Sequence, residues 1–269
     1  MISSKTLKFQ QNFIGSCYCM FTVIRALFLR ETYTLYGTSR FGYAWALLRD
    51  VFAVGAFIIV KILIGIQYKY GLHIVFFILT GFFVYRVVAE CISKCMTAIQ
   101  ANTAILSFPH VFPLDVMISR CLFVFYTNIQ SSVVVIILAV LYGLDFDIVN
   151  IGVFVYCIVA ALFLGFSAGI LMSALAIFYP VVERVWPIIK RLGFWGSGVF
   201  FTIDRFPAKY AEPLSYNPVL QLIEGLRKSL YHGIDFGSLL NFHYVNFLVL
   251  IFFTLGLLLL KLSRGRLNA

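Results

Sequence analysis

A stripe of aromatic and basic residues is the part of this sequence whose residue types and spacing could do chemistry. Its members follow one another at spacings of four, four, three and four, and they are Trp186, Lys190, Phe194, Ser197 and Phe201, with Arg191 beside the lysine. On one α-helix they share an arc of roughly 80°. Aromatic faces bind the C–H groups of sugars, and a cation among them attracts a polyanion. The stripe therefore predicts either a lining for an acidic glycan or a lipid-facing surface whose lysine reaches the headgroups.

The first apolar segment carries a second set of candidates. Lys61 lies deep in this segment, where a charge costs on the order of 2.5–3.5 kcal/mol, so it should face protein, water or the headgroups. Arg49 and Asp50 lie at the start of the segment and predict a local ion pair. If the aromatic stripe faces lipid, we expect the path of a translocated molecule to follow this segment instead, past Trp45, Arg49 and Lys61.

Motifs for catalysis and nucleotide binding are missing from the sequence. None of the 19 glycines precedes a lysine, so there is no phosphate-binding P-loop. The four histidines and six cysteines show no spacing typical of a zinc site. Arg86 and Glu90 are four residues apart, which predicts a helical ion pair rather than an acid–base site. We therefore predict a chain that is not an enzyme and that binds no cofactor or metal of its own.

The composition indicates that the helices carrying these residues lie in a membrane. The 269 residues are 62% hydrophobic and 12% charged, and the mean hydropathy is +0.96. A soluble domain has about 45–50% apolar and about 25% charged residues. Because so apolar a chain cannot cover itself with polar surface, it needs lipid, and we interpret the net charge of +10 as a bias between the loops rather than as affinity for nucleic acid.

Six apolar stretches are candidates for crossing a bilayer, which takes about 20 residues per helix. They lie near 46–66, 72–92, 118–141, 149–178, 185–203 and 241–262, and the fifth is short. The predicted fold is an all-α membrane protein with a six-helix transmembrane domain over residues 46–262 and a tail at 263–269. The external segment 204–240 contains three prolines and is too apolar for a free loop, so we expect short re-entrant helices there.

The N-terminal segment and the loop charges predict the orientation. Residues 1–45 contain an apolar face with spacings of four and three, made by Phe13, Cys17, Met20, Ile24 and Leu27. This pattern is typical of an amphipathic helix at the membrane interface, and a loose tail is the alternative. Of the 21 lysines and arginines, fifteen lie in the N-terminal segment, in the alternate connections and in the tail, against five on the opposite side. Both termini are therefore predicted to be cytoplasmic.

Several blocks of the sequence resemble the permeases of type 2 ABC exporters, most closely those that export capsular polysaccharide. The blocks are ALFLRE at 26–31, YGTSRFGYAWALL at 36–48, AIQAN at 98–102 followed by Pro113, Asp115 and Arg120, WPII at 186–189, and Pro207, Asn217-Pro218, Glu224 and Arg227. They follow the family's order along nearly the whole chain. Arg49-Asp50 stands where such permeases often have Glu-Pro, so the kink of that proline is not implied here.

The resemblance implies an assembly. It implies a homodimer with two cytoplasmic ATPase subunits that bind ATP and Mg²⁺, a lipid-linked polysaccharide as substrate, and periplasmic and outer-membrane export partners. It also implies that the ATPase couples through Arg30, Glu31, Asn102 and Asp115. We therefore predict a permease for an acidic capsular polysaccharide. The alternatives are a related permease for O-antigen, teichoic acid or a small drug, and an ATP-independent glycan flippase or acyltransferase.

Overall fold

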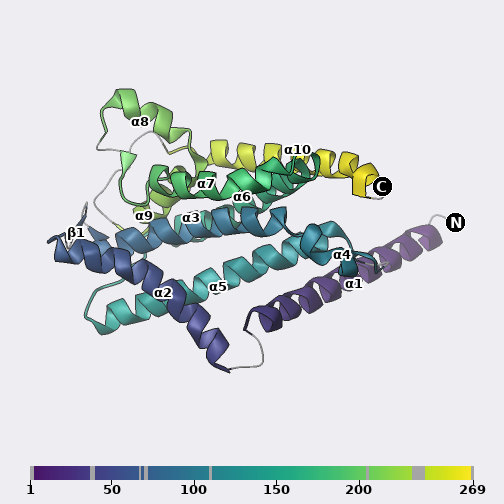
Figure 1. Cartoon of the computed structure of the whole chain (residues 1–269), viewed down its shortest axis with the longest axis horizontal. Helices are drawn as coiled ribbons and strands as arrows, with labels where there is room; N and C mark the ends of the chain where they lie inside the picture. The colour runs from purple at the N-terminus through teal and green to yellow at the C-terminus, as the bar shows by residue number, and fades with distance from the viewer. Residues whose placement is uncertain are drawn as a thin grey trace.

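The computed structural model is an elongated helical bundle in which α3, α5, α6 and α10 run along the long axis (Figure 1). It describes residues 3–36, 40–66, 68–69, 72–108, 111–203, 206–231 and 240–267. The elements in chain order are α1 (Ser3–Tyr36), α2 (Arg40–Leu63), β1 (Tyr68–Lys69), β2 (Leu72–His73), α3 (Ile74–Met96), η1 (Gln100–Asn102), α4 (Thr103–Leu106), α5 (Pro113–Leu141), α6 (Ile151–Phe178), α7 (Val181–Gly196), α8 (Ala208–Ser215), α9 (Pro218–Lys228) and α10 (Phe242–Leu267). The first turn of α1 and the last turn of α10 lie at the same end of the molecule (Figure 1).

Four helices in the described residues are long and apolar enough to cross a membrane: α3, α5, α6 and the part of α10 that ends at Ser263. Helix α7 has 16 residues and is about 24 Å long, short of the ~30 Å hydrocarbon core. Helix α2 has 24 residues but carries Arg49, Asp50 and Lys61. The prediction of an all-α membrane protein agrees with this architecture, and the two-residue strands β1 and β2 form its one described hairpin.

Helix α6 is the centre of the bundle and packs against α3 on one side and α10 on the other. The contact with α3 is made by two glycines four residues apart. A Cβ at Gly165 would lie 2.9 Å from the Cβ of Cys91, and one at Gly169 would lie 2.8 Å from the Cβ of Cys95. Small residues at this spacing let helix backbones approach closely where lipid supplies no hydrophobic driving force. The pair therefore fixes α3 against α6.

Side-chain caps explain where the main helices begin. The side chains of His73, Asn150 and Asn217 accept hydrogen bonds from the backbone N–H groups of the first turns of α3, α6 and α9. Helix α5 begins with Pro113, whose missing N–H costs nothing at this position. Such caps satisfy donors that have no partner within the helix.

The predicted extent of the fifth span is wrong at its C-terminal end. Helix α7 stops at Gly196, and Gly198 has a φ of +79°. That backbone conformation suits glycine and ends the helix. Ser197 caps the helix and Phe201 lies in the loop beyond it, so these two residues do not extend the helical stripe.

Two short helices lie among the described residues of segment 204–240, and its external side and re-entrance stay predictions. Helix α8 and helix α9 lie within it, and residues 204–205 and 232–239 are outside the described residues. Helix α9 packs against α3 and α6, and its side chains from Leu220 to Arg227 are buried. Helix α9 is therefore part of the protein core, whereas most described side chains of α8 are exposed.

Candidate functional site

A cluster of charged and polar side chains joins α1 to the C-terminal end of α3 and to the connection between α3 and α5. An Nη of Arg30 donates to Oδ1 of Asn102 at 2.5 Å. Glu31 is 6% exposed and lies 3.4 Å from Nζ of Lys94. We call Arg30, Glu31, Lys94, Asn102 and Arg120 the α1–α3 cluster. Three of the four residues predicted for coupling to an ATPase are thus brought together, with Glu31 and Asn102 buried and the side chain of Arg30 about one third exposed.

Arg120 completes the α1–α3 cluster from α5. Its Nε lies 3.9 Å from Oε1 of Glu31, and one Nη donates to the carbonyl of Lys94 at 3.2 Å. Three cations therefore surround the carboxylate of Glu31, at distances longer than those of tight charge-assisted hydrogen bonds. The fourth predicted coupling residue, Asp115, accepts from the N–H of Phe112 at 3.0 Å and caps α5. Its predicted coupling role stays a prediction.

A second ion network links α2 to α3. The predicted pair of Arg86 and Glu90 is confirmed, with Nε and Oε1 at 2.7 Å. Arg86 also contacts Oδ1 of Asp50 at 2.5 Å, and Asp50 is 3.4 Å from Nε of Arg49. Arg86 can hold both carboxylates because its guanidinium presents several donors in one plane. The network fixes the middle of α2 to α3.

The candidate path residues of α2 lie on its surface. The side chain of Arg49 is 70% exposed, and Trp45 is 71% exposed. Lys61 is partly exposed in the last turn of the helix. Partial exposure of Lys61 agrees with both of its predicted surroundings, which are protein and lipid headgroups.

The aromatic stripe of α7 packs against α3. Nε1 of Trp186 donates to Oγ of Ser93 at 2.7 Å. The hydroxyl of Tyr85 donates to the carbonyl of Lys190. The ring of Phe194 meets that of Tyr85 at a centroid distance of 5.3 Å. Trp186 and Phe194 therefore hold α7 in place, and in this chain they face protein rather than an open surface.

The opposite face of α7 is the exposed one. Ile188, Leu192 and Trp195 are 61%, 67% and 59% exposed, and Arg191 is exposed beside them. Their spacing of four and three was available in the sequence, but it gave no reason to prefer this face to the stripe. The two faces differ because α3 covers only one of them.

Arg227 is the most buried cation in the described residues, with 0% exposure. Its guanidinium donates to the carbonyls of Phe77, Val199 and Phe201 at 2.8–3.1 Å. It also lies 3.6 Å from the centroid of the Phe77 ring. We call this set of contacts the α9 anchor, because it ties α9 to α3 and to the loop after α7. Glu224, one turn earlier, accepts from the N–H of Ile203 at 2.5 Å.

Chemical groups for catalysis or metal binding do not assemble in the described part of the chain. No group of three His, Cys, Asp or Glu residues there could hold a metal ion. At the start of α3, burial lowers the pKa of His73, whose Nδ1 accepts from the N–H of Val75 at 3.4 Å. This histidine serves as a helix cap. The expectation that the chain binds no cofactor stays a prediction.

Comparison with known proteins supports the same resemblance that the sequence blocks indicate. No family model matches the chain. The chain is 26% identical to the polysialic acid transport protein KpsM of Escherichia coli, over 87% of this chain and 91% of that protein. It is 25% identical to the capsule polysaccharide export inner-membrane protein CtrC of Neisseria meningitidis serogroup A, over 94% and 96% of the two chains. The chain is similar to capsule polysaccharide export inner-membrane proteins. The predicted resemblance is confirmed.

The similarity reaches a third kind of exporter at lower identity. The O-antigen export system permease protein RfbA of Klebsiella pneumoniae is 22% identical over 88% of each chain. Each of the three likenesses to capsule and O-antigen export proteins covers at least 87% of this chain. Lys94 was missed as a member of the cluster because nothing in its local sequence distinguishes it from an ordinary surface lysine. Arg120 and Arg227 lie in the blocks that carry the resemblance, but the sequence did not predict which groups they contact.

Proposed function

We propose that the chain is the permease subunit of an ABC exporter that moves a capsular polysaccharide across the inner membrane. The observation that carries this is the similarity to capsule export proteins of several bacterial species along about nine tenths of the chain. The likeness to an O-antigen permease favours that polymer class as the second candidate. A flippase or acyltransferase has no comparable support.

The proposed topology has six spans, with α2 and α7 added to the four long apolar helices. Both termini lie in the cytoplasm, and α8 and α9 form a re-entrant unit on the external side. The asymmetry of lysines and arginines supports this orientation. The shared end of α1 and α10 in Figure 1 is consistent with it. Helix α1 would then lie at the inner interface, with Tyr18, Phe21 and Tyr33 among its exposed apolar side chains.

The proposed assembly is a homodimer in which a lipid-linked, acidic polymer passes between the two permeases. The exposed faces of α2 and α7 support it, since they hold large apolar side chains together with cations. Trp45, Arg49, Lys61 and Arg191 are the proposed path residues on these faces. The other candidates have a supporting role in the proposed path, because they make contacts within the chain. They are Lys190, Trp186, Phe194 and Phe201.

The proposed energy source is a pair of cytoplasmic ATPase subunits, which bind the ATP and Mg²⁺. They would contact α1 and the connection between α3 and α5, with Arg30, Glu31, Asn102 and Asp115 at the contact. The α1–α3 cluster supports this, because it links α1 to that connection and to α3. Periplasmic and outer-membrane export proteins would complete the route to the cell surface.

Deletion of the chain in its own bacterium tests the proposal. Surface polysaccharide should disappear while polymer accumulates inside the cell, and the native chain on a plasmid should restore export. Deletion of the cognate ATPase, the matched control, should give the same accumulation. Loss of polymer synthesis itself, or unchanged surface polymer of altered acylation, would contradict a transport role.

A further inference from the structure

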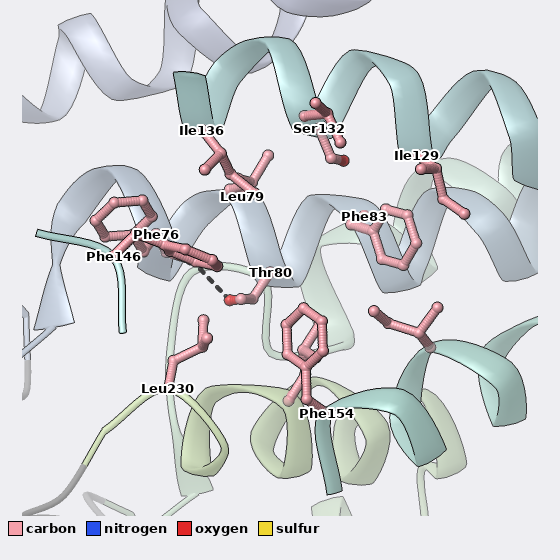
Figure 2. A pocket seen from close by; sticks show the side chains of 13 residues that line it. Phe76, Leu79, Thr80, Phe83, Ile129, Ser132, Ile136, Phe146, Phe154 and Leu230 are labelled. Carbon is pink, nitrogen blue, oxygen red and sulfur yellow. Dashed lines mark hydrogen bonds between the residues drawn. The ribbon is translucent and has the colours of Figure 1, made fainter. Parts of the chain in front are cut away.

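An apolar cavity of about 200 Å³ lies among α3, α5, α6 and α9. Figure 2 shows phenylalanine rings closing it from several sides. The wall includes Phe76, Thr80 and Phe83 of α3, and Phe154 of α6. Leu230, just after α9, closes the end that faces the connection between α5 and α6. Side chains from four separate elements therefore shape one space.

The chemistry of the wall excludes water as its stable content. Thr80 and Ser132 are the two lining residues with polar side chains. The hydroxyl of Thr80 already donates to the carbonyl of Phe76 at 2.9 Å (Figure 2). A buried water molecule needs two to four polar partners, and an apolar cavity of about 150 Å³ is known to stay dry and to bind a small hydrocarbon. The space therefore suits hydrocarbon.

The opening of the cavity identifies where that hydrocarbon comes from. Val133 lines the cavity and is also 46% exposed on the outer side of α5. Its neighbours Ile137 and Leu138 are both exposed large aliphatic side chains. Surfaces at which membrane helices pack favour Gly, Ala, Ser and Thr instead. Since α5 is one of the four span-competent helices, the mouth opens to lipid rather than to a protein neighbour.

We infer that this cavity binds one acyl chain of a bilayer phospholipid, which enters beside Val133 and reaches α3. With the proposed topology, the chain comes from the outer leaflet. The inference does not depend on what the exporter carries. An acyl chain in this position fills the gap between α5 and α6, which both pack on α3 and touch one another little.

Photolabelling of the full-length chain in phosphatidylcholine proteoliposomes tests the site. The probe is a phosphatidylcholine whose acyl chain carries a diazirine, and the labelled residues are mapped by mass spectrometry. Thr80 and Phe83 are 5% and 6% exposed, so carbene label on them must arrive through the cavity. We expect label at these two residues and at the exposed control Ile137, and none at Val84, which has 0% exposure.

Filling the cavity supplies the matched comparison. Ser132→Phe should lower label at Thr80 and Phe83 by at least about fivefold, because a ring in this space leaves no room for a chain. Label at Ile137 should stay unchanged. Ile158→Phe serves the same purpose if the first variant does not fold. Native label at Ile137 without label at Thr80 and Phe83, or label there that survives both substitutions, overturns the inference.

Discussion

Helix α3 is held by two polar anchors that differ in kind. The α9 anchor buries one guanidinium completely and satisfies it with backbone carbonyls at 2.8–3.1 Å. The α1–α3 cluster holds Glu31 among cations at 3.4–3.9 Å, and the side chains of Arg30 and Lys94 are about one third exposed. Fixed carbonyls allow one arrangement, whereas long side chains around one carboxylate allow several. The α9 anchor therefore stabilises the fold of the single chain. The α1–α3 cluster can rearrange, which suits a site that changes conformation when a partner binds.

Removal of Arg227 should have the largest effect. Arg227→Ala removes three buried hydrogen bonds from a charged donor and should destabilise the chain by at least about 3 kcal/mol, because each such bond contributes about 1.5–3 kcal/mol. Thermal unfolding of the purified protein in detergent and its level in the membrane measure this. Lys261→Ala, an exposed lysine on α10, is the control and should change stability by less than about 0.5 kcal/mol. Equal stability of the two variants would show that the α9 anchor is not structural.

Substitution on the two faces of α7 should separate packing from transport. Phe194→Ala removes ring contacts with Tyr85 on α3 and should cost about 2–3 kcal/mol in stability. Leu192→Ala, on the exposed face, should leave the stability of the single chain nearly unchanged. Unfolding midpoints and surface polysaccharide per molecule of permease distinguish them. If Phe194→Ala keeps full stability but loses export, the aromatic stripe is the path lining after all.

Charge reversal in the α1–α3 cluster should loosen the packing of α1 on α3 and, with it, weaken binding of the ATPase. Glu31→Arg puts a fourth cation where one carboxylate held three, and co-purification of the ATPase should fall about tenfold, which corresponds to about 1.4 kcal/mol. Arg25→Glu, an exposed change on the same helix, is the control. The double variant Glu31→Arg with Arg120→Glu should recover part of the loss. Unchanged ATPase binding and export in Glu31→Arg would remove the cluster from coupling.

The smallest effect concerns His73 near the α9 anchor. Because burial lowers its pKa, the folded chain binds this proton less well than the unfolded chain. The stabilisation from the neutral cap is present above the unfolded pKa of about 6.5 and is lost as the pH falls through the lowered folded value. We expect a loss below about 1 kcal/mol on acidification. His73→Asn keeps an acceptor that does not titrate, so its stability should lack this pH dependence; identical profiles would exclude the effect.

Hydrophobicity predicted the helices well, and local spacing predicted local contacts. Each of the six apolar stretches contains a helix, although the fifth helix ends at Gly196, and the ion pair of Arg86 and Glu90 follows from their spacing of four residues. The contact of Arg86 with Asp50 spans 36 positions, and no periodic pattern reports such a distance. It depends on how α2 crosses α3.

The orientation of α7 shows the limit of periodicity. The stripe of Trp186 and Phe194 was correctly placed on one helical face, but periodicity does not say which neighbour covers that face. The structure places it against α3, and it ends the helix at Gly196 before Phe201. For the same reason the set of candidate residues for coupling contained Arg30, Glu31 and Asn102 but not Lys94. Contacts between helices decide these points.

Reconstitution tests the central claim most directly. The purified chain is placed in proteoliposomes, alone or with its cognate ATPase, together with the labelled lipid-linked polysaccharide of its own cell. The chain alone should hydrolyse no ATP and move no polymer, whereas the two together should move polymer across the bilayer only while ATP is hydrolysed. Movement by the chain alone, or a covalent change to the glycan, would contradict its role as the permease of an ATP-driven exporter.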